Sequence, residues 1–278
     1  MTYTTIHLHL TPYPSPTSTA AIDYACALAK LLEARLEVSS SHLSITPPKN
    51  WLGGAMMGKM ARELEATLAK TTEQLESHAR SVALAAIIEA TVTPVAEPWP
   101  AGLQDSSWRG RVSDVCVLGL PPAGSDGRFG IEDWLFGSGR PCLLYPDKST
   151  QTLSLEHVLV CWDFSKSAAR AVIDALPLLQ NAARVHIAVF RGEKDLPVKD
   201  AGAPLIAFLA AHGVRSEADD VQIGDQTIGA AVLEYAARTD ADLLVMGAYG
   251  HSRMQEFLLG GATREILDRS TLPLLMSH

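Results

Sequence analysis

Short apolar runs and helical patterns alternate along the whole chain. A β-prone run at 5–10 is followed by apolar residues at helical spacing over 20–34, which Ser18 can cap, and then by a second β-prone run at 35–38. A strand, a helix and another strand in this order predict parallel strands joined by a right-handed crossover.

The same alternation continues to the end of the chain. In the first half we expect a long amphipathic helix, a strand, a shorter helix and two strands, at 56–82, 86–93, 102–112, 114–119 and 141–146. In the second half we expect strands at 157–162, 184–190, within 214–223, 242–246 and 272–276, separated by helices at 165–181, 203–212, 227–238 and after residue 261. The pattern predicts five strands in each half.

Two segments of the first half recur in the second. Residues 113–119 (SDVCVLG) parallel 241–247 (ADLLVMG), and 140–144 (RPCLL) parallel 272–276 (LPLLM). The offsets are 128 residues (241 minus 113) and 132 residues (272 minus 140). Such a small drift is a modest difference in loop length, so a duplicated domain explains the pattern.

These patterns predict an α/β fold made of two tandem, doubly wound, five-stranded parallel-sheet domains of the Rossmann-like type. We place the domains at 1–147 and 154–278, with a polar linker between them. The segments 141–146 and 272–276 are short apolar edge strands that would otherwise remain exposed. We therefore expect the two domains to pack against each other through their final strands.

Composition narrows the classes of partner. The 278-residue chain has a formal net charge of −8 and no long acidic run, which disfavours nucleic acid and an anionic membrane surface. No apolar run approaches the roughly 18 to 20 residues needed to cross a bilayer. The first residues lack a basic segment followed by an apolar stretch, so we expect neither a secretory signal nor a transit peptide. We expect a cytoplasmic protein.

The four cysteines indicate packing, with a redox role as the alternative. Cys26, Cys116, Cys142 and Cys161 have no C-x-x-C spacing, and three of them lie in β-prone runs, where buried free thiols are common. No cluster of His, Cys and Asp has the spacing of metal ligands. We expect no metal site built from side chains.

A glycine-rich segment follows the predicted strand at 242–246. The spacing Gly-x2-Gly-x9-Gly begins at Gly247, and Gly261 opens the next helical pattern. At the carboxyl ends of parallel strands, glycines let backbone amides approach a phosphate, and a helix N-terminus supplies oriented N–H groups. Arg253 and Arg264 are candidate positive groups. The alternative is that these glycines only turn the chain and begin helices.

Two other patterns carry less weight. Residues 53–59 fit the G-x4-G-K part of a P-loop, but Met60 replaces the hydroxyl that would hold magnesium, and no convincing buried strand precedes them. We interpret this segment as a loop or the start of a helix. His251 and Ser252 suggest a base and a nucleophile, yet adjacent residues on a turn seldom face each other.

Residues 242–263, followed by Leu272-Pro-Leu-Leu, resemble the C-terminal signature of the universal stress protein family, whose nucleotide-binding members carry Gly-x2-Gly-x9-Gly-Ser/Thr. Residues 158–165 (VLVCWDFS) resemble the family's first strand, which ends in an aspartate followed by a small polar cluster. The likeness covers 154–278 well and reaches 1–147 through element order and the matching fourth and fifth strands. The whole chain resembles a tandem universal stress protein.

By this resemblance the second half binds an adenine nucleotide, ATP or AMP, with or without magnesium. Asp163 would contact the adenosine moiety, and the strand around Val189 would line the adenine pocket. Ribose and phosphates would be held by Met246, Gly247, Gly250, Gly260, Gly261, Ala262 and Thr263. One departure concerns the phosphates, because Gly261 stands where the family has a Ser or Thr hydroxyl. Thr263 is a candidate substitute.

The first half departs further from the family pattern. Gly119 is followed by Leu-Pro-Pro, so position 122 is a proline without an N–H, and the predicted first strand ends in Thr11-Pro12 without an aspartate. We expect that this half does not bind nucleotide in the family manner. It would serve as a pseudo-symmetric partner or bind something else.

The leading hypothesis is a stress-response regulatory or sensing module that binds an adenine nucleotide in its second half. Nothing beyond Asp163 resembles a general base, and no dedicated magnesium ligands are apparent. Two alternatives stay open, a slow ATPase that uses the same site and a nucleotide-free scaffold. The family resemblance is also compatible with a homodimer.

Overall fold

The structure is a computed structural model that describes residues 2–45, 54–99, 106–124, 128–192, 200–248 and 261–278. The first half contains β1 (Thr5–Leu10), α1 (Thr19–Leu31), β2 (Arg35–Ile45), α2 (Gly54–Ala86), β3 (Ala90–Trp99), the 3₁₀ helix η1 (Ser107–Val112), β4 (Val115–Leu120), α3 (Arg128–Gly137) and β5 (Cys142–Pro146). The second half contains β6 (His157–Cys161), α4 (Lys166–Leu179), β7 (Arg184–Arg191), α5 (Ala203–Ala211), β8 (Ser216–Gln222), α6 (Ile228–Arg238), β9 (Leu243–Gly247), α7 (Gly261–Arg269) and β10 (Leu274–Ser277).

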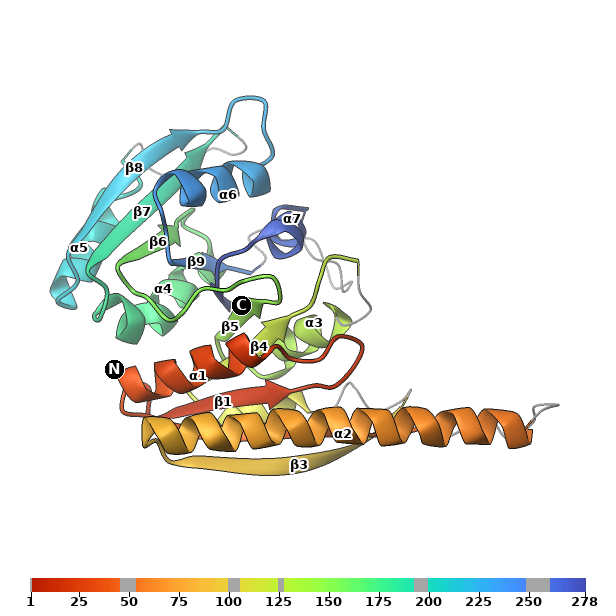
Figure 1. Cartoon of the computed structure of the whole chain (residues 1–278). Helices are drawn as coiled ribbons and strands as arrows, with labels where there is room; N and C mark the ends of the chain where they lie inside the picture. The colour runs from red at the N-terminus through yellow and green to blue at the C-terminus, as the bar shows by residue number, and fades with distance from the viewer. Residues whose placement is uncertain (1, 46–53, 100–105, 125–127, 193–199, 249–260) are drawn as a thin grey trace.

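The strands of the described residues form one sheet in the order β3-β2-β1-β4-β5-β10-β9-β6-β7-β8 (Figure 1). The strands within each half are parallel, whereas β5 pairs antiparallel with β10 and places Leu143 opposite Leu275. Both of these leucines are fully buried. The predicted α/β fold with two doubly wound, five-stranded parallel halves is confirmed, and the two halves share a single continuous sheet.

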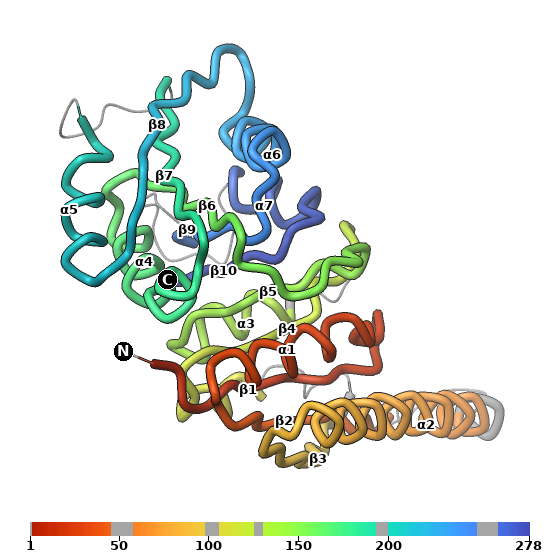
Figure 2. Tube along the Cα trace, turned by 60° about the vertical axis from the view of Figure 1, so that its left-hand side comes forward, coloured from red at the N-terminus to blue at the C-terminus, as the bar shows by residue number. Residues whose placement is uncertain are grey.

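Helices cover both faces of this sheet, and the two halves follow one another along it (Figure 2). The core on one face includes side chains of α1, α2, α4 and α5, and the core on the other face includes side chains of α3, α6 and α7. The direction in which the chain crosses therefore changes between β1 and β4, and again between β6 and β9. Ligands of open α/β sheets bind at such switch points, beyond the carboxyl ends of the strands.

An aspartate fixes the amino end of the first strand in each half. Asp114 accepts the N–H groups of Thr4 (2.7 Å) and Thr5 (2.9 Å), and Asp242 accepts the N–H of His157 (2.8 Å). Burial raises the pKa of Asp114, but these hydrogen bonds outweigh it and hold the pKa below its usual value. The repeated segments at 113–119 and 241–247 thus share a structural role.

Several elements of the first half differ from the prediction. The strand expected at 86–93 begins later, because α2 continues to Ala86 and Ile87 then turns the chain with a φ of 58°. Alanine favours continuation of the helix, while Ile88 packs against the core and so mimics the start of a strand in the sequence. Within the helix expected at 102–112, the described residues form only the short η1. Helix α3 was not predicted.

Helix α2 also shows that the described part of the P-loop-like segment at 53–59 does not have the conformation of a phosphate-binding loop. It begins at Gly54, so the described part of 53–59 is helical and not a phosphate loop after a buried strand. With 33 residues α2 is long. Even so, no helix in the described part of the chain is both long and apolar enough to cross a bilayer.

Candidate functional site

A cavity of about 120 Å³ lies at the carboxyl edge of the second half, at the switch point between β6 and β9. The described residues that line it are Cys161, Trp162, Asp163, Ser165, Ala168, Phe190, Ile228, Val232, Met246, Gly247, Ala262, Thr263 and Ile266. They come from the ends of three strands and from the first turns of α4, α6 and α7. Five predicted site residues meet here, namely Asp163, Met246, Gly247, Ala262 and Thr263.

Asp163 lines the cavity from the turn that leads into α4. Its Oδ1 accepts the N–H of Ser165 (2.9 Å), and the Ser165 hydroxyl in turn accepts the N–H of Ala168 (3.1 Å). Between them, Phe164 adopts a positive φ of 59°. Asp163 therefore supports the start of α4 in addition to lining the cavity, which sequence reasoning did not anticipate.

Gly247 lies where β9 comes closest to the first turn of α4. A Cβ at this position would stand 2.4 Å from the backbone nitrogen of Ala168 and 2.6 Å from the hydroxyl of Ser167. Packing against α4 thus accounts for glycine at this position without any ligand. The corresponding Gly119 of the first half is less crowded, because its nearest neighbour, a Thr17 side-chain carbon, is 3.4 Å away.

The inner wall of the cavity is apolar. Phe190 and Met246 contribute to it, beside Cys161, whose pKa is raised by burial and by the neighbouring Asp163 charge. Val189 does not line the cavity. It is 1% exposed and packs into the core on the opposite face of the sheet. Successive strand residues face opposite sides, so the adjacent Phe190 takes the place expected for the strand around Val189.

The phosphate end of the predicted site is only partly described. Gly250, Gly260 and the neighbouring His251, Ser252 and Arg253 lie outside the described residues. Gly261 is exposed at the start of α7 and is not among the lining residues, and a Cβ there would meet nothing within 4 Å. Thr263, the third residue of α7, is 5% exposed and lines the cavity.

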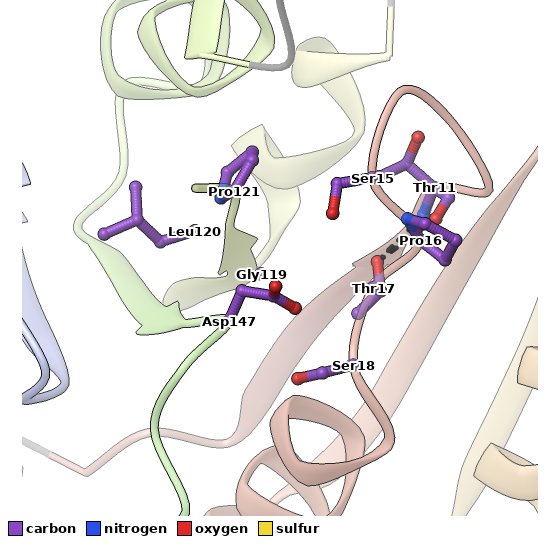
Figure 3. Close-up of a pocket in the computed structure, with 9 residues that line it drawn as sticks. All are labelled: Thr11, Ser15, Pro16, Thr17, Ser18, Gly119, Leu120, Pro121 and Asp147. Atoms are coloured by element: carbon purple, nitrogen blue, oxygen red, sulfur yellow. Dashed lines mark hydrogen bonds between the residues drawn. The ribbon is translucent and has the colours of Figure 1, made fainter. Parts of the chain in front are cut away.

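The first half has a far smaller cavity at the equivalent switch point. Figure 3 shows residues of the loop after β1, including Thr11 and Thr17, gathered opposite Gly119 at the end of β4. The cavity volume is about 10 Å³. The loop closes on itself, because Thr17 N–H donates to Thr11 O (2.9 Å) and Thr11 N–H donates to the Thr17 hydroxyl (3.0 Å).

A longer loop accounts for this difference. Residues 11–17 precede the helix cap Ser18, whereas only 162–164 precede the cap Ser165, which makes seven residues against three. Strand pairing puts Thr11 where the second half has Asp163. The extra residues fold over the end of β1 and fill the crevice.

The strand positions of the first half that correspond to Cys161 and Ala188 carry polar side chains. His9 pairs with Ser39 across β1 and β2, in the way that Cys161 pairs with Ala188 across β6 and β7. The Ser39 hydroxyl hydrogen-bonds to Nδ1 of His9 (2.9 Å), and the Trp134 ring lies 4.9 Å from the His9 ring.

His7 extends this network. Its Nε2 lies 2.8 Å from the same Ser39 hydroxyl. Burial lowers the pKa of His7 to about 4, and Arg109 adds to the effect. Burial also lowers the pKa of His9, to about 3, so both imidazoles of the network are neutral at neutral pH.

In the described parts of the chain, no group of three His, Cys, Asp or Glu side chains is placed so that it could hold a metal ion. The one carboxylate that lines the second-half cavity there is Asp163.

Comparison with known proteins places these features in context. The profile of the Universal stress protein family matches residues 154–278. A universal stress protein of Synechocystis sp. is 38% identical over 45 residues, a match that spans 16% of this chain and only 16% of that relative.

Two solved structures extend the likeness to the whole chain. A universal stress protein from Archaeoglobus fulgidus is 18% identical with a TM-score of 0.72, and the match covers 98% of this chain and 95% of the other. A putative universal stress protein from Pseudomonas aeruginosa is 14% identical with a TM-score of 0.59, over 99% of this chain and 93% of the other. At these identities the likeness establishes a shared tandem fold.

Proposed function

We propose that residues 154–278, which match the profile of the Universal stress protein family, bind an adenine nucleotide, ATP or AMP, in the cavity between β6 and β9. The chain would act as a stress-response regulatory or sensing module. The observation that carries the proposal is that Asp163, Met246, Gly247 and Thr263 meet at one switch-point cavity.

The composition of the cavity fits the two parts of a nucleoside. Its apolar wall, with Phe190, Val232 and Met246, suits a flat base that makes few polar demands. The Asp163 carboxylate that lines the cavity can accept ribose hydroxyls, and the start of α7 offers backbone N–H groups to a phosphate. Magnesium, where present, would be held mainly through the phosphates of the ligand.

We propose a binding role ahead of a catalytic one. Asp163, the one lining carboxylate of the described residues, already accepts the N–H of Ser165 and lies on a turn that it helps to build. Slow hydrolysis of ATP at the same site is measured directly by incubating the protein with ATP and magnesium and following ADP. If ATP is unchanged after long incubation, the ATPase alternative is wrong.

We also propose that one chain binds one nucleotide. In the first half the loop 11–17 fills the crevice, and Thr11 replaces the aspartate. Mass spectrometry of ligand released from protein purified without added nucleotide, with calorimetric stoichiometry, tests this. Adenine nucleotide at about one equivalent is the expected result.

The role of Asp163 is tested by two substitutions. Asp163→Asn retains an oxygen for the Ser165 N–H but removes the charge, whereas Asp163→Ala removes both. We expect Asp163→Ala to weaken adenosine binding roughly tenfold, even without phosphates, because a charged hydrogen bond is worth about 1.5–3 kcal/mol. Asp163→Asn should lie between the wild type and Asp163→Ala.

Calorimetry with adenosine, AMP and ATP provides the measurement, and Thr11→Ala, the matched change in the first half, serves as the control. Thr11→Ala should leave the affinity unchanged. Wild-type affinity in both Asp163 variants would remove this residue from the site. A variant that loses only ATP binding and not AMP binding would show that the assignment to adenosine is wrong.

A further inference from the structure

Two histidines of β1 share one serine of β2 beneath helix α3. Nε2 of His7 lies 2.8 Å and Nδ1 of His9 lies 2.9 Å from the Ser39 hydroxyl. Nε2 of His9 lies 3.3 Å from the hydroxyl of Ser41. The Trp134 ring of α3 contacts both imidazoles, with ring centroids 5.2 Å and 4.9 Å away. We call His7 and His9 the histidine pair.

Hydrogen bonding around Ser39 suits a neutral histidine pair. A neutral imidazole has one N–H and one acceptor nitrogen, so the Ser39 hydroxyl can donate to one ring and accept the N–H of the other. If both rings carried a second proton, both would present an N–H to Ser39. The proton of the Ser39 hydroxyl would then lose its acceptor at a buried position.

The direct contacts of the histidine pair also supply no countercharge, because they are two hydroxyls and an indole ring. Burial lowers the pKa of His7 and His9, and the Arg109 charge adds to both effects. The other titratable or charged side chains on the elements around the pair are Arg35 and Glu37 of β2, Glu97 of β3, Cys116 of β4, Arg111 of η1, Glu132 and Asp133 of α3, and Cys142 of β5.

The layer that covers the histidine pair, formed by η1 and α3, is closely packed. A Cβ on Gly110 of η1 would stand 2.4 Å from Sγ of Cys116 and 3.1 Å from the Trp134 ring. Nε of Arg111 donates to the Gly137 carbonyl at the end of α3 (3.0 Å), which ties η1 to α3. An imidazolium needs water or a counterion, and close packing leaves room for neither unless this η1–α3 layer moves.

The second half lacks a histidine at the positions that correspond to His9 and Ser39, which are Cys161 and Ala188. Its nearby His186 has a different environment. Nε2 of His186 lies 3.1 Å from Asp219, and Nδ1 lies 3.4 Å from Glu217. A proton on His186 would therefore meet carboxylates, whereas a proton on the histidine pair would not.

We propose that the histidine pair makes the first half acid-sensitive, so that protonation of the pair displaces the η1–α3 layer from the sheet while the second half keeps its fold. The inference goes beyond the proposed function and does not depend on it. It gives the half that is not expected to bind nucleotide a regulatory role of its own.

The direction of the effect follows from the difference in pKa between the closed and open states. In the open state each imidazole returns to a pKa of about 6.5, whereas in the closed state burial holds His7 at about 4 and His9 at about 3. The closed state therefore loses stability as the pH falls below about 6.5 and is unaffected by the pair above it. Glu97 acts in the opposite sense, because burial raises its pKa and the closed state holds its proton more firmly.

Hydrogen–deuterium exchange of the full chain, corrected for the intrinsic pH dependence of exchange, measures opening of each segment. From pH 6 to pH 5 we expect the opening equilibrium of residues 107–112 and 130–137 to rise roughly ten- to fiftyfold, because opening takes up about one to two protons net. Residues 157–161 of β6 should change far less. An equal rise in both halves would indicate general acid unfolding and overturn the inference, as would no rise in η1 and α3.

Substitution of the histidine pair removes the titrating groups. His7→Gln places an amide near the position of Nε2, and His9→Asn places one near Nδ1. The double variant should lose the acid-dependent opening of η1 and α3. The control is His212→Gln, which changes an exposed histidine of the second half and should behave as the wild type. A folded double variant that opens in acid as the wild type does would overturn the role of the pair.

A measurement on the unmodified protein keeps the inference testable if the double variant does not fold. Nuclear magnetic resonance of the imidazole groups follows the protonation of His7 and His9 directly. We expect both rings to stay neutral in the closed state at pH 5. If either ring titrates near pH 6.5 while η1 and α3 stay protected from exchange, the histidine pair does not couple protonation to opening and the inference is wrong.

Discussion

At the scale of single residues, glycines of the second-half signature differ in what they require. Tertiary packing requires glycine at position 247, because a Cβ there would meet backbone atoms at the start of α4. Packing does not require glycine at position 261, since a Cβ there would meet nothing within 4 Å. The segment therefore combines a glycine that packing requires, Gly247, with one that packing does not require, Gly261.

Gly247→Ala should destabilise the protein by about 1–3 kcal/mol, as overpacking of a close contact does. The reason is the 2.4 Å approach of the added carbon to the Ala168 nitrogen. Urea unfolding measures the change, and Gly261→Ala is the control, which should be neutral or slightly stabilising because alanine favours the helix. Equal stabilities of Gly247→Ala and the wild type would contradict the packing role.

At the scale of elements, the helices that follow the first strand of each half begin alike. Ser18 caps α1 by accepting the N–H of Ala21 (3.2 Å), and Ser165 caps α4 by accepting that of Ala168 (3.1 Å). The two caps differ in surroundings, because only Ser165 lies in the larger cavity. Both halves therefore cap this helix with a serine, but only the serine of the second half also lines the larger cavity.

Ser18→Ala and Ser165→Ala should each lower the free energy of unfolding by about 1 kcal/mol, the usual effect of losing an N-cap. Only Ser165→Ala should also weaken nucleotide binding, since the same hydroxyl helps to order the turn that carries Asp163. Chemical unfolding and calorimetry on the two variants separate the effects. A loss of affinity in Ser18→Ala as large as that in Ser165→Ala would argue against a site confined to the second half.

At the scale of the whole molecule, the antiparallel pair of β5 and β10 joins the halves. Leu143 and Leu275 face each other there with no exposed surface, so this junction between the halves, the β5–β10 seam, is part of the core.

The two outer edge strands of the sheet, β3 and β8, are less suited to pairing with a strand of another molecule. β3 carries Pro94 and Pro98, and β8 is rich in acidic side chains, both of which oppose addition of another strand. The homodimer inferred from family likeness stays a prediction, and sheet extension is a disfavoured route to it.

Separation of the halves should expose the seam. A fragment of residues 148–278 would leave the β10 edge unpaired, and we expect it to dimerise through antiparallel β10 strands in place of β5. Light scattering after size-exclusion chromatography measures its mass against that of the full chain. Leu275→Lys in the fragment should prevent the association, and a monomeric wild-type fragment that is folded would contradict the expectation.

Local sequence determined much of this protein. Alternating apolar runs placed most strands, a hydroxyl cap marked the start of α1, and an aspartate just after β6 was correctly expected at the carboxyl edge of the sheet, because each of these signals acts within a few residues of the chain. Tertiary structure decided what depends on distant neighbours. It selected Phe190 over Val189 for the cavity, folded loop 11–17 into the first crevice, made Gly247 a packing contact, and paired β5 antiparallel with β10. None of these follows from local pattern, because each depends on which segments meet in space.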